Sequence, residues 1–129
     1  VVSAEIVDTV VEFVGAINRH DLGGISRLLA PNHRFVDSLG SEIVGRDAVM
    51  AAWHNYFGIV PNYLITVHRR MHDGTEVALF GTAAGSSSAP GEAPQNWSIP
   101  FAAHARVESG LVSEWQVFAD NEPLRSILR

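Results

Sequence analysis

Residues 99–119, IPFAAHARVESGLVSEWQVFA, carry the pattern that decides the fold. In two runs, 99–107 and 111–119, most odd-numbered residues are apolar, and the turn sequence Glu108-Ser109-Gly110 separates the runs. A period of two predicts a pair of antiparallel strands that share one apolar face. The opposite face of this pair carries both polar and apolar side chains: His104, Arg106, Glu114 and Gln116, with Val112 and Phe118 among them.

Two more strands are expected before this pair. The segment Tyr63–Met71 alternates in the same way, Asp73-Gly74 is a typical hairpin turn, and Val77–Gly81 forms the returning strand. The stretch from Gly85 to Gln95 is small, polar and rich in proline and glycine, which predicts a loop. Such a loop is either a lid or simply unstructured.

The first part of the chain has a helical period instead. Apolar residues recur at helical spacing within Ser3–Arg19. Asp21 is placed to cap a second, short helix that Pro31 would end. A third helix is expected over Arg46–Phe57, with its apolar side chains on one face.

The order of these elements predicts the fold class. A short strand, His33–Asp37, lies between the second and third helices, and the long strands follow. Helices first and strands after, in a chain of 129 residues, predict one α+β domain over residues 1–129. We expect three N-terminal helices to pack on a strongly curved antiparallel sheet around an apolar pocket.

Composition excludes several function classes. The net charge of −5 and the scattered basic residues argue against a nucleic-acid surface. The chain has no cysteine, which excludes disulfides and thiolate metal sites. It has no apolar run long enough to span a bilayer and no signal peptide as it stands, so we expect a cytoplasmic protein without membrane contact. No phosphate-binding or dinucleotide motif is present, and no cofactor is expected.

The order and spacing of several segments resemble the nuclear transport factor two-like superfamily. These segments are Phe13–Leu22, Leu28–Ala30, Phe35–Gly40, Gly45–Ala48, Val112–Trp115 and Asp120–Leu124. The chain looks most similar to the SnoaL-like and ketosteroid isomerase-like branch. The resemblance implies a cone, in which three helices close over a bent sheet and leave an internal pocket. That branch includes isomerases, polyketide cyclases, epoxide hydrolases and dehydratases, so the fold does not settle the function.

Asp37 is the strongest candidate for a catalytic group. It shares a strand face with Phe35 and is expected to point into the apolar interior. The resemblance implies that the matching residue of ketosteroid isomerases is their general base. Desolvation raises the pKa of carboxylic acids in general, which suits proton abstraction near neutral pH. Alternatively, Asp37 caps the turn Ser38-Leu39-Gly40 through backbone N–H groups.

The resemblance also shows what this chain lacks. Phe13 stands at the position of the oxyanion tyrosine of the isomerases, and Ala103 at the position of their protonated aspartate. Neither side chain can donate a hydrogen bond, and losing one such donor costs on the order of 10²–10³ in rate. The acidic residue of the epoxide hydrolase pattern would fall near Val117. Ketosteroid isomerisation by the usual route is therefore not expected.

Other side chains could replace the missing donors. We expect His54 and Tyr56 on the third helix to act with Asp37, His54 as an acid–base partner and Tyr56 as a donor to a carbonyl group. His54 could equally be an ordinary surface or core histidine, and the tryptophans could serve only in packing. The residues expected to contact a ligand are Phe13, Trp53, Trp97, Phe101, Ala103, Trp115 and Val117.

No metal site is expected. His68 and His72 are four residues apart in a predicted strand, about 13 Å, which is too far for joint ligation. Asp120 is a second acidic residue near the end of the last strand, where a capping role competes with an acid–base role.

Two hypotheses of function remain open. The first is an enzyme that binds a small apolar molecule and uses Asp37 for isomerisation, cyclisation or dehydration by proton transfer. The second is a non-catalytic domain that binds a ligand or a protein. In either case the half-apolar outer sheet face, which includes Val112 and Phe118, suits a homodimer.

Overall fold

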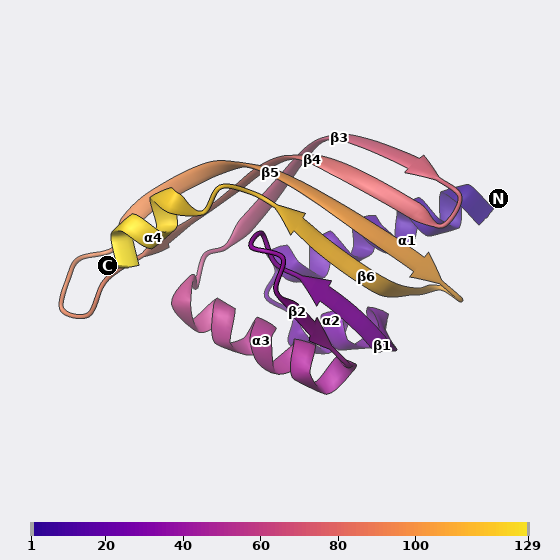
Figure 1. Ribbon diagram of the computed structural model, residues 1–129, viewed down its shortest axis with the longest axis horizontal. Coiled ribbons are helices and arrows are strands. Elements are labelled where there is room, and N and C mark those ends of the chain that lie inside the picture. The colour runs from indigo at the N-terminus through magenta and orange to yellow at the C-terminus, as the bar shows by residue number, and fades with distance from the viewer. Residues whose placement is uncertain (1, 129) are drawn as a thin grey trace.

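The computed structural model describes the backbone of residues 2–128 and the side chains of residues 4–128. It has the expected α+β class, with helices and a bent six-stranded sheet (Figure 1). The sheet order is β2-β1-β6-β5-β4-β3. The elements are α1 (Val2–Asn18), α2 (Leu22–Leu28), β1 (Leu29–Val36), β2 (Glu42–Val44), α3 (Arg46–Ile59), β3 (Leu64–Asp73), β4 (Glu76–Ser87), β5 (Gln95–Glu108), β6 (Leu111–Phe118) and α4 (Glu122–Leu128).

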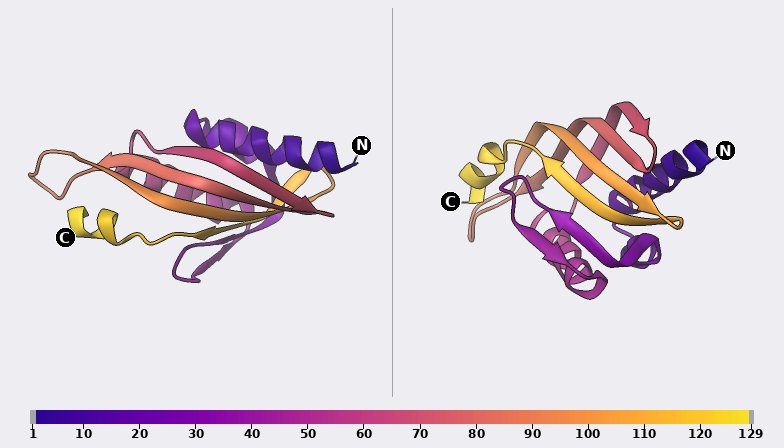
Figure 2. Two further views of the ribbon diagram at one scale, coloured as in Figure 1. Left: turned by 90° about the horizontal axis from the view of Figure 1, so that it is seen from above. Right: turned by 45° about the vertical axis from the view of Figure 1, so that its right-hand side comes forward.

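The helices divide the inner face of the sheet between them. Helix α1 lies against β3 to β6, whereas α3 lies against β1 and β2. Figure 2 shows α1 running along the sheet, and the two chain ends lie at opposite ends of the long axis of the molecule. Among the described residues, no helix is long and apolar enough to cross a bilayer.

The strand pattern of the sequence is confirmed. The odd-numbered residues of β5 from Ile99 to Val107 are all buried, and Val112 and Trp115 of β6 lie beside them on the inner side. The expectation that Val112 lies on the outer face was wrong, because the β5–β6 register shifts between Arg106 and Val107 and pairs Val112 with Val107. Phe13 from α1 packs on Trp115 with ring centroids 5.1 Å apart. This apolar layer fixes the register of the hairpin, because a slip of one residue would expose all of these side chains.

One local expectation was wrong, and one strand pairing was not predicted. The four long strands β3 to β6 are antiparallel as expected, whereas the short β1 joins β6 in parallel. Pro31 does not end the second helix but lies inside β1, because α2 already stops at Leu28. The expected cap of α2 is present, with the Asp21 carboxylate accepting a hydrogen bond from the Gly24 N–H at 3.0 Å.

The long strands β3 and β4 bend where glycine allows close approach. A Cβ atom at Gly81 would lie 1.8 Å from the backbone oxygen of Thr66. The β3–β4 register shifts at this place, between Val67 and Arg69. Only glycine fits here, and the bulge increases the local twist of the sheet.

Candidate functional site

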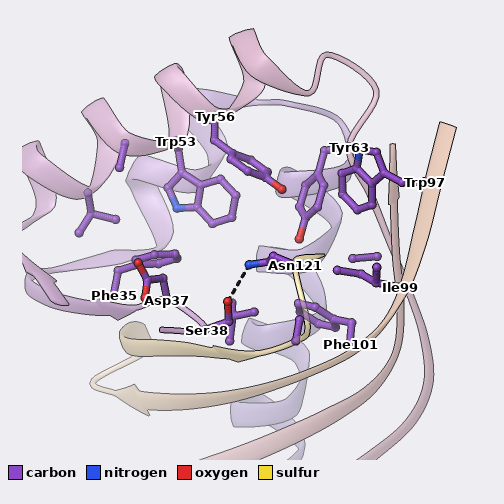
Figure 3. Close-up of a pocket in the computed structure, with 15 residues that line it drawn as sticks. Phe35, Asp37, Ser38, Trp53, Tyr56, Tyr63, Trp97, Ile99, Phe101 and Asn121 are labelled. Carbon is purple, nitrogen blue, oxygen red and sulfur yellow. Dashed lines mark hydrogen bonds between the residues drawn. The ribbon is translucent and has the colours of Figure 1, made fainter. Parts of the chain in front are cut away.

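A cavity of about 310 Å³ lies between α3 and the inner face of the sheet. Figure 3 shows its lining, which is mainly aromatic and aliphatic. The lining residues are Phe35, Asp37, Ser38, Val49, Ala52, Trp53, Tyr56, Tyr63, Ala83, Trp97, Ile99, Phe101, Val117, Ala119 and Asn121. An apolar cavity with a few polar groups is the usual form of a small-molecule site.

Asp37 lies at the edge of this cavity and also holds a turn. It follows β1, and its Oδ1 atom accepts hydrogen bonds from the Leu39 N–H at 2.9 Å and the Ser41 N–H at 3.0 Å. The Asp37 N–H in turn donates to the Ser41 carbonyl at 3.0 Å. The second oxygen, Oδ2, has no hydrogen-bond partner within residues 2–128. The turn therefore holds the carboxylate through Oδ1, and Oδ2 is left to contact a molecule in the cavity.

Two tyrosines lie at the end of the cavity between α3 and β3. The rings of Tyr56 and Tyr63 are nearly perpendicular, at 88°, with centroids 5.0 Å apart. In Figure 3 both hydroxyls point into the cavity. Burial raises the pKa of the Tyr56 phenol to about 12, and burial together with the nearby Tyr56 raises the pKa of Tyr63 further. Both phenols are therefore neutral hydrogen-bond donors at physiological pH.

A hydrogen bond between distant segments closes another side of the cavity. Asn121, between β6 and α4, donates from Nδ2 to the Ser38 hydroxyl at 2.6 Å (Figure 3). Ser38 belongs to the turn that Asp37 holds. Sequence reasoning missed Asn121, Ser38 and Tyr63 as lining residues. The one signal for them was a position at the end of a predicted strand or within two residues of it.

The tryptophans play different parts. Trp97 lines the cavity while its indole N–H donates to the Ser87 hydroxyl at 3.1 Å. Trp53 is 6% exposed, and its buried Nε1 has no hydrogen-bond partner within the described residues. The Trp53 ring meets Phe35 edge to face, with centroids 6.0 Å apart. Trp53 thus forms a rigid aromatic wall next to Asp37 (Figure 3).

Only some of the expected site residues gather at the cavity. Asp37 and Tyr56 line it, together with the expected ligand contacts Trp53, Trp97, Phe101 and Val117.

Three of the expected ligand contacts, Phe13, Ala103 and Trp115, are instead buried in the core and are not among the cavity-lining residues. Phe13 and Trp115 pack against each other, edge to face, further along the sheet. Ala103 lies two residues beyond Phe101 on β5, about 7 Å along the strand.

His54 is exposed on α3, so it does not form the expected pair with Asp37 inside the cavity. It follows the buried Trp53, and neighbouring helical residues point about 100° apart. Asp120 is exposed too, and its Oδ1 atom accepts a hydrogen bond from the Glu122 N–H at 3.0 Å, at the start of α4.

The cavity has one charged side chain in its lining, the Asp37 carboxylate. No lysine, arginine or histidine is among the lining residues. Within residues that the structure describes, no cluster of three or more His, Asp or Glu side chains could hold a metal ion. The chemistry that this lining offers is thus hydrogen bonding and proton transfer to one carboxylate.

Comparison with known proteins places the chain in a family. The sequence profile of the SnoaL-like domain matches residues 10–115. Over 95 residues, 68% of this chain, the sequence is 34% identical to the epoxide hydrolase LasB of Streptomyces lasalocidi. The chain spans about a third (31%) of the length of that relative.

Solved structures show the same fold. A proposed polyketide cyclase of Xanthomonas campestris pv. campestris superposes with a TM-score of 0.88 at 16% identity, covering 98% of both chains. AclR, a proposed hydroxylase of Streptomyces galilaeus, superposes with a TM-score of 0.79 at 23% identity, covering 95% of this chain and 94% of its own. At these identities the superpositions establish the cone fold of nuclear transport factor two-like proteins. With the profile matching most of its length, the chain belongs to the SnoaL-like domain family.

Proposed function

We propose that the protein binds a small, largely apolar molecule in the α3 cavity and moves a proton on it with Asp37. The observation that carries this proposal is the placement of Asp37, with Oδ1 held by two backbone N–H groups and Oδ2 without a partner at the edge of an apolar cavity. A base must be held in position and still be accessible, and this carboxylate is both.

The proposed step is removal of a proton from carbon next to a carbonyl group. Asp37 Oδ2 takes the proton, and the electron pair of the broken C–H bond moves to the carbonyl oxygen to give an enolate. Tyr56, a neutral donor on the cavity wall, stabilises that oxygen. Return of the proton to a more distant carbon of an unsaturated ketone gives an isomer. Attack of the enolate carbon on a second carbonyl group of the same molecule gives a ring, and the proton on Asp37 passes to the new alkoxide. Loss of a hydroxyl group on the next carbon gives dehydration, in which that hydroxyl takes the proton from Asp37 and leaves as water.

Proton exchange tests this step without knowledge of the net reaction. We would incubate a panel of enones, steroids, aromatic polyketide-like ketones and epoxides with the protein in D₂O and follow C–H signals by NMR. Epoxides are included because LasB carries the name of an epoxide hydrolase. The proposal predicts exchange of one acidic position by the wild type and none by Asp37→Asn.

The control variant for this experiment is Asp120→Asn. This substitution changes an exposed carboxylate that does not line the cavity, and the variant should catalyse exchange like the wild type. Equal exchange by wild type and Asp37→Asn would remove Asp37 as the base. Absence of exchange from every panel member, with tight binding of one, would favour a protein that binds without reaction.

Binding without catalysis is the second candidate, and one observation favours it. The bonds from Leu39 and Ser41 to Asp37 Oδ1 already give the carboxylate a structural role in its turn. On this alternative the cavity holds the ligand through apolar contact alone. Asp37→Asn would then leave the ligand affinity unchanged.

We also propose that two copies associate through the outer face of the sheet. Phe80 of β4 and Phe118 of β6 flank Ala102 of β5 in one row across the sheet, and the two rings are 40% and 53% exposed. Further along the same face, Arg106 lies between Glu76 and Glu114 in one row, and His104 of the neighbouring row contacts both carboxylates. An apolar row beside paired charges suits a two-fold contact.

Light scattering coupled to size exclusion should give the mass of a dimer for the wild type. The variant Phe118→Glu should shift it towards the 14.0 kDa monomer. A clean monomer for the wild type would refute the association.

A further inference from the structure

We propose that Tyr56 and Tyr63 together form a binding site for the carbonyl oxygen of an uncharged ligand, at the α3–β3 end of the cavity. This inference deepens the proposed function and rests on it, because it assumes that a ligand occupies this cavity. It adds the class of ligand: a neutral ketone or similar carbonyl compound, and not a carboxylate or phosphate.

The geometry of the two phenols supports a shared acceptor. Their rings are 5.0 Å apart and nearly perpendicular, and both hydroxyls point into the same space (Figure 3). Neither hydroxyl has a hydrogen-bond partner within the described residues, and neither is among the fully buried polar atoms that lack one, so both are open to the cavity. An oxygen with two lone pairs can accept from both hydroxyls at once.

The state of the phenols fits the role of donor. Burial raises the pKa of both groups, so they keep their protons across the physiological range. A neutral phenol in an apolar cavity donates to an acceptor that gains negative charge, and that interaction is stronger there than in water.

The charges in the lining decide the class of ligand. Asp37 is the one charged side chain among the lining residues, and no cationic side chain lines the cavity. An anionic ligand would lose its hydration and meet a carboxylate with no counter-charge. A neutral carbonyl compound avoids both costs and satisfies the two hydroxyls.

This site differs from the one that family resemblance implies. Phe13 and Ala103 occupy the expected donor positions, and both are buried in the core and absent from the cavity lining. Tyr56 comes from α3, and Tyr63 precedes β3 after the turn that ends α3. The chain thus places its donors on the helix side of the cavity.

Three naphthalenes of nearly equal shape test the inference. The probes are 2-acetylnaphthalene, 2-isopropenylnaphthalene, in which a CH₂ group replaces the carbonyl oxygen, and 2-naphthoate. Calorimetry would measure their affinities for the wild type, for Tyr56→Phe with Tyr63→Phe, and for Asp37→Asn. Infrared spectra of ¹³C-labelled 2-acetylnaphthalene would report the carbonyl stretch in each complex.

The wild type should bind the ketone about 10-fold more tightly than the alkene, as expected for two net hydrogen bonds. In the double tyrosine variant this preference should vanish while the alkene binds as before. The carbonyl band should lie at lower wavenumber in the wild type and return upward in the variant. Naphthoate should bind most weakly, and Asp37→Asn should improve its binding.

The control variant is Thr9→Val, which removes a hydroxyl on α1 outside the cavity lining and should change none of these values. Equal affinity for ketone and alkene, or a carbonyl band that ignores the double variant, overturns the tyrosine assignment. If Asp37-dependent proton exchange is retained in that case, the role of Asp37 as the base stands and only the tyrosine site is rejected. Failure of both neutral naphthalenes to bind overturns the inference together with its ligand class.

Discussion

Ionisation of the tyrosines gives a sharp physical test of the cavity. The chain contains two tyrosines, and both line the cavity, so the tyrosinate absorbance of the folded protein reports on this site alone. A solvated phenol ionises near pH 10. Burial raises the pKa of Tyr56 to about 12 and that of Tyr63 further. We therefore expect almost no tyrosinate signal from the folded protein at pH 11.

The same shift predicts alkaline unfolding. The folded state holds the phenol protons more tightly than the unfolded state does. The neutral phenols therefore make their full contribution to the free energy of unfolding below pH 10, and this contribution is lost as the pH rises through the folded pKa. A shift of the Tyr56 pKa from 10.0 to about 12 corresponds to a loss of about 2.7 kcal/mol once the pH exceeds the folded pKa. Urea unfolding at pH 9 and pH 11.5 would measure the loss.

The variant Tyr56→Phe separates the two phenols. It should lose less stability between these pH values than the wild type, because one of the two shifted groups is gone. An ordinary titration of both phenols near pH 10 in the folded protein would refute the claim that their hydroxyls lie in an apolar cavity.

Three further predictions concern the scaffold. Burial lowers the pKa of His33, whose Nδ1 contacts the Val112 carbonyl at 2.7 Å, so the stability present above pH 6.5 should fall as the pH drops through the lowered pKa. Its ring NMR signals should change to those of the protonated form at a lower pH than the signals of a solvated histidine, and a change at the ordinary pH would contradict this. Gly81→Ala should lower the free energy of unfolding by several kcal/mol, because its Cβ would overlap the Thr66 backbone. Gly58→Ala in α3 is the control: its Cβ would meet nothing within 4 Å, so the variant should be neutral or more stable by up to about 1 kcal/mol. Equal urea midpoints for the two variants would contradict a close approach of β3 and β4 at Gly81. His54→Ala should leave ligand affinity and proton exchange unchanged, and a loss in either assay would return His54 to the site.

The sequence predicted those parts of the fold that depend on local period. The alternation from Ile99 to Val107 specifies which face of β5 is buried, and the Asp21 cap marks the start of α2. The parallel pairing of β1 with β6 was not predicted, because the period of a strand does not state its partner. The expectation that Pro31 ends the second helix was wrong, because a proline is also compatible with the irregular start of β1, where the register shifts between Leu29 and Arg34.

The site was predicted only where one residue's direction follows from its neighbours. Asp37 shares the face of Phe35, and both line the cavity as alternation requires. The hydrogen bond from Asn121 to Ser38 joins residues 83 positions apart, and no local pattern could indicate it. The depth of Phe13 in the core depends on its packing with Trp115, which is a property of the assembled fold.

Thermal unfolding of the wild type and of Asp37→Asn, each with the enone, steroid, aromatic ketone and epoxide panel, measures whether a ligand binds beside Asp37. A ligand at about 100 times its Kd should add roughly 2.7 kcal/mol, which is several degrees for a domain of this size. We expect at least one neutral carbonyl compound to raise the unfolding temperature of the wild type by an amount that changes in Asp37→Asn. Shifts that are the same in both proteins, or no shift with any compound, would contradict a ligand site beside Asp37.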